Sequence, residues 1–149
     1  MTEAGQTVPD DAQAAGGARE TKPVIAVFNS SDDTVDLLRT FLEEQGFQTV
    51  VGQIPDVKKG ELDLVAFIEH HAPSVIVYDI SPPYDANWTF LRLVRSSAPV
   101  QDRRFVITTT NKPALDKIVG ATEAIEIIGK PYDLNQVAAA IRSALSPPP

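Results

Sequence analysis

The chain has 149 residues, of which 43% are hydrophobic, so it can bury one core but not the cores of two ordinary domains. Its 20 acidic and 13 basic residues give a formal net charge of -7 with no basic cluster, and we expect no binding to nucleic acid or membranes. The absence of cysteine excludes disulfides and thiolate chemistry. No apolar run approaches a membrane span and no secretory leader is visible, which predicts a cytoplasmic protein.

The two ends of the chain differ in composition from its middle. Residues 1–22 are mostly small and polar, so they cannot bury enough apolar surface to offset the entropy of ordering, and they predict a disordered N-terminal tail. Residues 147–149 are three prolines, which predict a frayed C-terminus. The remaining residues, 23–146, are predicted to form one domain.

Short apolar runs rich in β-branched residues predict the strands. The three clearest are Val24–Phe28, Val75–Tyr78 and Phe105–Ile107, and Gln48–Val51 and Ala124–Ile128 are weaker candidates. The clear runs are continuous rather than alternating with polar residues. Strands of this kind are buried on both faces, which is typical of a parallel sheet covered by helices.

Amphipathic segments lie between these strands. The first helix is expected to start at Asp32 or Asp33 and to stop at Gly46. Further helices are predicted at residues 62–69, 88–95, 114–119 and 134–145, the last capped by Asp133, whereas residues 52–60 are expected to be a long loop. Five strands alternating with five helices predict an α/β fold with a doubly wound parallel sheet in three layers.

Polar residues follow several of the predicted strands. Asn29 to Asp33 follow the first, Asp79 the third, Thr108 to Thr110 the fourth and Lys130 the fifth. Ligands of open parallel sheets bind beyond the carboxyl ends of the strands, where these side chains are expected to meet. A carboxylate, a hydroxyl and an ammonium group at one edge predict a pocket of the size of a phosphoryl group.

Three motifs resemble the receiver domain of response regulators, which has a flavodoxin-like fold. They are the segment from Pro73 to Ile80 with Pro83 four residues beyond Asp79, the run from Phe105 to Thr109, and Gly129–Asp133. The resemblance extends over residues 23–145. It implies that Asp79 is the phospho-acceptor, that Thr109 is the switch hydroxyl, and that Lys130 binds the phosphoryl group and precedes a cis peptide bond to Pro131.

The sequence departs from the family where receivers hold magnesium. Two acidic residues usually follow the first strand, whereas Asn29 and Ser30 occupy these positions. Magnesium in proteins takes carboxylate oxygens, so we expect weak magnesium binding at most, and no bound metal. Asp32 and Asp33 are candidate substitutes for the acidic pair, although capping of the first helix explains one of them more simply.

Two further family positions are changed. Ile127 stands where the family often has an aromatic switch residue, and Asn87 replaces a usual glycine. Asp79 could therefore serve either as a phospho-acceptor or as the partner of Lys130 in a structural ion pair.

Three functions are consistent with these residues. The first is a stand-alone atypical receiver without enzymatic activity, which binds another signalling protein and needs no cofactor. The second is a phosphorylatable receiver that accepts phosphate at Asp79 from a histidine kinase and uses magnesium. The third is a flavodoxin-like cofactor binder, which is disfavoured because residues 29–34 contain no glycine that would let the backbone approach a phosphate.

The partner surface is an expectation carried by the same resemblance. Receivers commonly bind partners or form homodimers through the region that corresponds here to residues 114–119, 124–128 and 133–145. On the last predicted helix, Asn135, Gln136 and Arg142 are expected on the exposed side.

Overall fold

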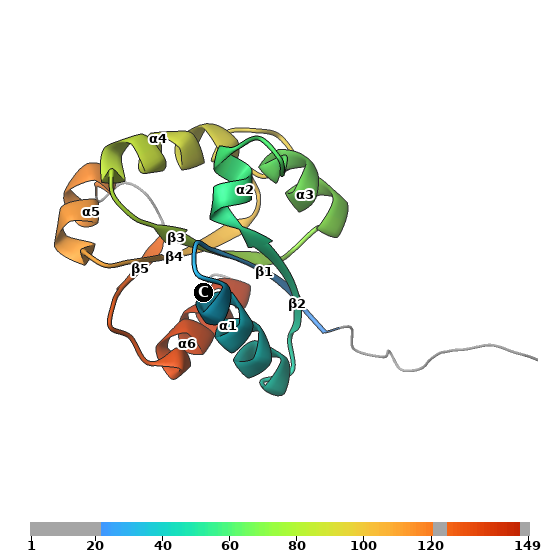
Figure 1. Cartoon of the computed structure of the whole chain (residues 1–149). Helices are drawn as coiled ribbons and strands as arrows, with labels where there is room; N and C mark the ends of the chain where they lie inside the picture. The colour runs from blue at the N-terminus through green and yellow to red at the C-terminus, as the bar shows by residue number, and fades with distance from the viewer. Residues whose placement is uncertain (1–21, 121–124, 147–149) are drawn as a thin grey trace, which may run out of the picture.

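Five parallel strands form one sheet in the order β2–β1–β3–β4–β5 in the computed structural model, which describes residues 22–120 and 125–146 (Figure 1). The strands are β1 (Val24–Asn29), β2 (Gln48–Gln53), β3 (Val75–Ile80), β4 (Arg104–Thr109) and β5 (Glu126–Gly129). All five predicted strands are confirmed, although residue 124 lies outside the described residues. The predicted tail, apart from Lys22, and the predicted frayed C-terminus also lie outside them.

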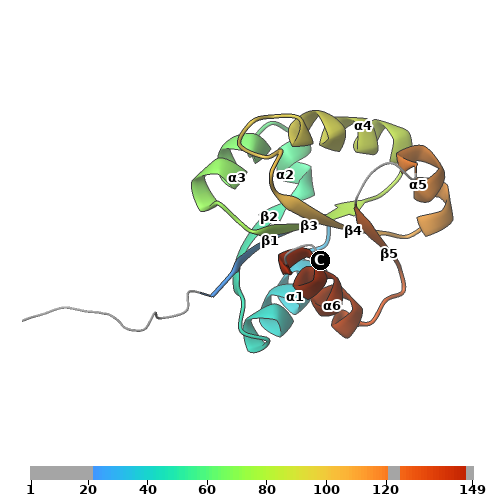
Figure 2. The same cartoon turned by 180° about the vertical axis from the view of Figure 1, so that it is seen from behind.

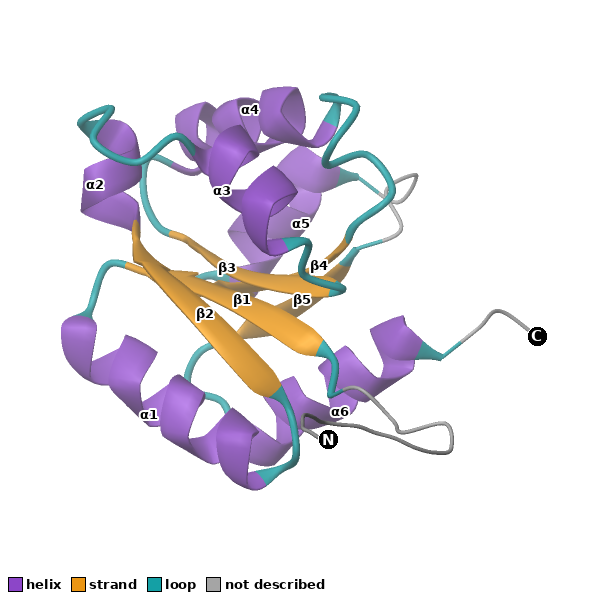
Figure 3. Ribbon diagram, turned by 90° about the vertical axis from the view of Figure 1, so that its right-hand side faces the viewer, coloured by secondary structure: helices purple, strands orange, loops and turns teal. Residues whose placement is uncertain are grey.

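Helices cover both faces of the sheet, which confirms the three-layer α/β prediction. The helices are α1 (Asp32–Glu44), α2 (Ile54–Lys58), α3 (Leu64–His71), α4 (Tyr84–Arg95), α5 (Lys112–Val119) and α6 (Leu134–Leu145). In both Figure 1 and the reverse view of Figure 2, α2 to α5 lie on one face of the sheet and α1 and α6 on the other. Figure 3 shows the sheet between these two layers.

The structure corrects several predicted helix boundaries. Residues 52–60, predicted to be a loop, contain the end of β2 and the short helix α2. Helix α1 is capped by the side chain of Ser31, which accepts a hydrogen bond from the Thr34 N–H, whereas Asp32 and Asp33 lie in its first turn. Three other helices begin at different residues from those predicted. Helix α3 begins at Leu64 rather than at residue 62, α4 at Tyr84 rather than at residue 88, and α5 at Lys112 rather than at residue 114.

The remaining cap predictions are confirmed. Gly46 follows α1 with a φ of +97°, a conformation that glycine adopts without steric cost, and so the helix ends there. Asp133 caps α6 and accepts a hydrogen bond from the Asn135 N–H, while the Gln136 side chain accepts one from the Asp133 N–H. Such a reciprocal pair satisfies two N–H groups that the helix leaves without partners.

The sheet separates two hydrophobic clusters because successive side chains on a strand point to opposite faces. Ile76, Tyr78 and Ile80 of β3 pack against the α2–α5 layer, where Trp88 is the largest buried side chain. Val75 and Val77 of the same strand belong to the cluster under α1 and α6. Each fully buried aliphatic side chain contributes roughly 1.5–3 kcal/mol to folding, so strand β3 is fixed from both sides.

The strand order places the predicted site. The chain reverses its direction across the sheet between β1 and β3, which are neighbours, and β4 follows on the other side of β3. In the register of β3 and β4, Asp79 stands opposite Thr108. The carboxyl ends of these central strands therefore bring Asn29, Asp79 and Thr108 to one edge, the usual location of a ligand site in an open α/β sheet.

Candidate functional site

Asp79 lies at the centre of the predicted site and has two polar partners. Lys130 Nζ lies 2.9 Å from Asp79 Oδ1, and the Thr108 hydroxyl donates a hydrogen bond of 2.7 Å to the same oxygen. The side chain of Asp79 is 6% exposed and that of Lys130 is 28% exposed. The predicted carboxylate, hydroxyl and ammonium group therefore do meet at this edge, and they form a largely buried, charge-neutral set.

The threonine that meets Asp79 is Thr108, whereas the resemblance points to Thr109 as the switch hydroxyl. Thr109 is fully buried, and its hydroxyl accepts a hydrogen bond of 3.4 Å from the Asn111 N–H. Thr110 is exposed and its hydroxyl lies 2.9 Å from the hydroxyl of Tyr84. The three consecutive threonines thus have three different environments, and the switch role of Thr109 stays a prediction.

Asn29 ends β1 and Ser30 follows it, at the positions where the resemblance places the acidic pair of receivers. Asn29 is 3% exposed, and its side-chain carbonyl accepts a hydrogen bond of 3.1 Å from the Ser31 N–H. Ser30, by contrast, is exposed. The one oxygen that Asn29 could offer a cation is therefore already bound to the backbone of the loop that leads into α1.

The residues around Asp79 do not fit a magnesium ion. Asp32 and Asp33, the candidate substitutes for the acidic pair, are exposed in the first turn of α1. Among residues 22–120 and 125–146, no three His, Asp or Glu side chains lie close enough together to hold a metal. Magnesium usually takes one or two carboxylates, and here Asp79 has one oxygen paired with Lys130 and only Oδ2 left for a cation.

Two tyrosines beside Asp79 are held in their neutral form. Burial, and secondarily the negative charge of Asp79, raise the pKa of Tyr78 to about 12. The same two causes raise the pKa of Tyr132, although a hydrogen bond with the Thr108 side chain acts in the opposite direction. Tyr132 was not singled out from the sequence, although its position two residues after Lys130 places it on the loop that carries the ammonium group.

The other family positions are found near the site. The peptide bond between Lys130 and Pro131 is cis, as the resemblance implies. Ile127 is partly buried and packs against the core of the α2–α5 layer. Asn87, in the position of the usual glycine, donates a hydrogen bond of 2.6 Å from its side-chain amide to the carbonyl of Ser81.

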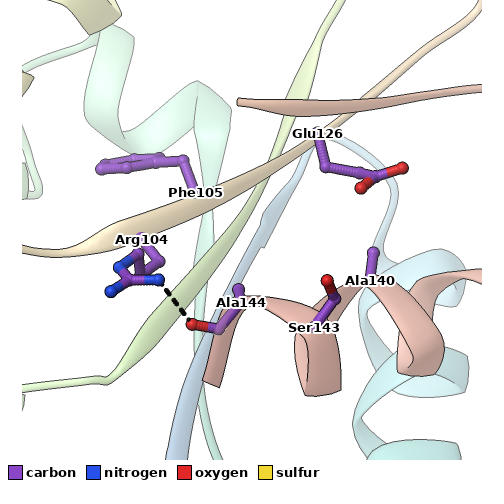
Figure 4. A pocket seen from close by; sticks show the side chains of 6 residues that line it. All are labelled: Arg104, Phe105, Glu126, Ala140, Ser143 and Ala144. Carbon is purple, nitrogen blue, oxygen red and sulfur yellow. Dashed lines mark hydrogen bonds between the residues drawn. The ribbon is translucent and has the colours of Figure 1, made fainter. Parts of the chain in front are cut away.

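A separate hollow lies at the opposite edge of the sheet, where strands β4 and β5 begin. It is lined by Arg104, Phe105, Glu126, Ala140, Ser143 and Ala144 (Figure 4). The Arg104 guanidinium donates a hydrogen bond of 2.9 Å to the carbonyl of Ala144 in α6. None of the predicted site residues lines this hollow, and its one guanidinium already has a partner.

Comparison with known proteins gives one curated relative. No family model matches the chain. Response regulator Rre1 of Synechocystis sp. (strain ATCC 27184 / PCC 6803 / Kazusa) is 26% identical over 110 residues, which cover 73% of this chain and 46% of the relative. The chain thus spans less than half of the length of this relative.

Solved structures of receiver domains share the fold. A CheY-like receiver domain from Methylobacillus flagellatus superposes with a TM-score of 0.65 at 14% identity, covering 83% of this chain and 99% of that one. The chemotaxis protein CheY4 of Vibrio cholerae has a TM-score of 0.65 at 17% identity, covering 84% of this chain and all (100%) of that one. At these identities the structures support the fold alone.

The comparisons agree with the arrangement of strands and motifs. None of the described helices is both long enough and apolar enough to cross a membrane. The parallel sheet has the strand order 2-1-3-4-5, the motifs around Asp79 and Lys130 stand at the ends of the expected strands, and the curated relative is a response regulator. The chain therefore has the fold of receiver domains, and its sequence is similar to that of a response regulator.

Proposed function

We propose that the chain is an atypical receiver, a non-enzymatic cytoplasmic signalling module that binds another protein without magnesium-dependent phosphorylation. The observation that carries this proposal is the contact between Lys130 Nζ and Asp79 Oδ1 at 2.9 Å. In a receiver with three carboxylates around one lysine, a metal relieves the excess of negative charge. Here one carboxylate faces one ammonium group, so the pocket is neutral without a metal.

The surface proposed for the partner comprises α5, β5 and α6. Ile118 of α5 is a large apolar side chain with 39% exposure, so this surface offers a partner one apolar contact. Of the residues expected on the exposed side of α6, Gln136 takes part in the helix cap, and Arg142 donates a hydrogen bond to the side chain of Gln45. Asn135 is therefore the better position at which to test binding, because a substitution there disturbs less of the fold.

The occupant proposed for this surface is another signalling protein. A homodimer would use the same surface, and sedimentation of the purified chain distinguishes the two. We expect a monomer that remains monomeric across concentrations and a partner that crosslinks to α5 or α6. A crosslink that maps to α1 or α3 would contradict this assignment.

A working phospho-acceptor is the second candidate, and one observation favours it. Both polar contacts of Asp79 go to Oδ1, and within the described part of the chain Oδ2 accepts no hydrogen bond. An oxygen without a partner is free to attack a phosphodonor such as the phosphohistidine of a histidine kinase. Lys130 would then hold the phosphoryl group, which is the role that the family resemblance implies.

Mass spectrometry distinguishes the two candidates. The chain is incubated with acetyl phosphate, with and without millimolar magnesium, and the mass added at Asp79 is measured against an Asp79→Asn control. The atypical receiver gives no magnesium-dependent addition. Stoichiometric addition that requires magnesium and is lost in Asp79→Asn would establish the phosphorylatable receiver instead.

A further inference from the structure

A pocket of about 370 Å³ lies in the α2–α5 layer, on the face of the sheet opposite to the site around Asp79. It is lined by Val57, Lys58, Tyr78, Pro83, Asn87 and Phe90. Its volume falls in the range of small-molecule sites, about 300–1,000 Å³, which are mostly apolar with a few polar groups. Helix α2, which supplies two of the lining residues, is the segment that the sequence predicts to be a loop longer than typical for the family.

Tyr78 is a buried donor without a partner in this pocket. Its side chain is 3% exposed, and its ring packs against Phe28 with 5.8 Å between ring centroids. The hydroxyl makes no hydrogen bond to any residue within 22–120 and 125–146. Buried polar groups in native proteins are nearly always satisfied, so an unpaired hydroxyl that lines a pocket calls for an acceptor inside it.

The remaining lining residues indicate the chemistry of that acceptor. Lys58 is exposed and forms no ion pair with the described residues, so it contributes an available positive charge at the rim. Val57, Pro83 and Phe90 supply apolar walls, and Phe90 is 41% exposed although it is a large aromatic residue. The amide of Asn87 is already held by the carbonyl of Ser81, which fixes this wall before any ligand arrives.

A second, more apolar hollow adjoins the first. It shares Val57 and Phe90 with the pocket, and its other lining residues are Leu62, Asp63, Leu64, Val65 and Val94. A ligand with its polar end near Tyr78 and Lys58 could extend its apolar body along the exposed face of Phe90 into this hollow.

We propose that the space between α2 and α4 binds a small organic acid with an apolar body. The carboxylate accepts a hydrogen bond from the Tyr78 hydroxyl and pairs with the Lys58 ammonium group, while the apolar body packs on Val57 and Phe90. Because Lys58 supplies a positive charge and Tyr78 a neutral donor, the site favours a carboxylate over a neutral amide of the same shape. This site is separate from Asp79 and stands whether or not Asp79 is phosphorylated.

The test is a titration of the whole chain followed by ¹H–¹⁵N NMR. The probes are octanoate, 3-phenylpropionate and indole-3-acetate, each with its primary amide as the uncharged match. We expect at least one acid to cause saturable shifts confined to α2, α3 and α4, and its amide to bind at least about fivefold more weakly, as the loss of one charge-assisted contact would give.

Two variants report on the polar anchors. Tyr78→Phe removes only the hydroxyl, and Lys58→Gln removes the charge at an exposed position where folding is not at risk. Each should weaken binding of the acid about fivefold, whereas Lys59→Gln, next in the chain but not lining the pocket, should leave it unchanged.

Three outcomes would overturn the proposal. The first is that none of the acids saturates below about 10 mM. The second is that Tyr78→Phe and Lys58→Gln both bind as the parent does, which would mean that water alone satisfies the hydroxyl. The third is that the shifts map to residues around Lys130 rather than to α2 and α4.

Discussion

Lys130 and Asp79 form an ion pair whose two members differ in their access to water. The nitrogen and Oδ1 are 2.9 Å apart, yet the carboxylate side chain is 6% exposed and the lysine side chain is 28% exposed. An unpaired charge costs most where water cannot reach it. The pair should therefore respond unequally to the loss of one member or the other.

Replacement of Lys130 by Met leaves the buried Asp79 without its cation. We expect a loss of about 3 kcal/mol in the free energy of unfolding, whereas Asp79→Asn should lose about 1 kcal/mol because the freed ammonium group can turn to solvent. The double variant should lose less than the sum of the two. Urea unfolding of the four proteins measures these values. An Asp79→Asn variant as stable as the parent would argue that Asp79 is kept for chemistry.

Helix α5 contains a second ion pair, which serves as a matched control for these stability measurements. Lys112 and Asp116 also form a 2.9 Å ion pair, but their side chains are 46% and 45% exposed. Exposed pairs of this kind contribute about 0.5 kcal/mol or less. We therefore expect Lys112→Met to leave the unfolding midpoint nearly unchanged.

Alkaline pH should destabilise the fold through Tyr78. The pKa of Tyr78 is raised to about 12 in the folded chain, against 10.0 for an unperturbed tyrosine, so the folded state keeps its proton where the unfolded state releases it. Stability should be unaffected by this group below pH 10 and fall between pH 10 and 12. The loss is about 1 kcal/mol at pH 11. Thermal unfolding from pH 8 to 11 should show a shallower decline for Tyr78→Phe, and identical slopes would refute the assignment.

Magnesium binding should be restored by returning two carboxylates to the loop after β1. Titration of the parent with magnesium up to roughly 10 mM should give no saturable NMR shifts around Asp79, because Asn29 offers a neutral amide oxygen in place of a carboxylate. The double variant Asn29→Asp and Ser30→Asp keeps an acceptor for the Ser31 N–H and should bind the ion. Saturable binding by the parent would contradict the atypical assignment.

Ser31 rather than either aspartate should be the residue on which the start of α1 depends. Ser31→Ala removes the acceptor of the Thr34 N–H and should cost about 1 kcal/mol. Ser30→Ala, one residue earlier and exposed, serves as the control and should cost almost nothing. Equal losses in Asp32→Ala would show that the charges of the first turn stabilise the helix as much as its cap does.

The strands and the layer order could be predicted because their signals are local. Runs such as Val75–Tyr78 are too apolar to be anything but buried on both faces, and Gly46 and Asp133 mark helix ends by their own backbone preferences. Helix α2 could not be predicted because its five residues are too few for a helical period to show. The start of α4 was placed too late because Pro82 and Pro83 favoured a loop.

The contact between Asp79 and Thr108 could not be predicted from the motifs alone, because it also depends on the register of β3 and β4. The family motif points to Thr109, but the threonine that contacts Asp79 is decided by which residue of β4 stands opposite it, and that is Thr108. Three threonines in a row give no local signal for this choice. Ser31, Asp32 and Asp33 pose the same difficulty, since all three are residue types that cap helices well.

Strand β3 carries Tyr78 and Asp79 side by side in the chain but on opposite faces of the sheet. The backbone of β3 thus separates the Tyr78 side chain, which titrates only in strong alkali, from the Asp79 side chain, which forms an ion pair. Moving the strand by a single residue would exchange them, placing a carboxylate in the aromatic layer and a phenol against the ammonium group. Insertions or deletions in the loop before Val75 should therefore be tolerated only when Tyr78 and Asp79 keep their faces of the sheet. A library of variants with different loop lengths would test this constraint directly.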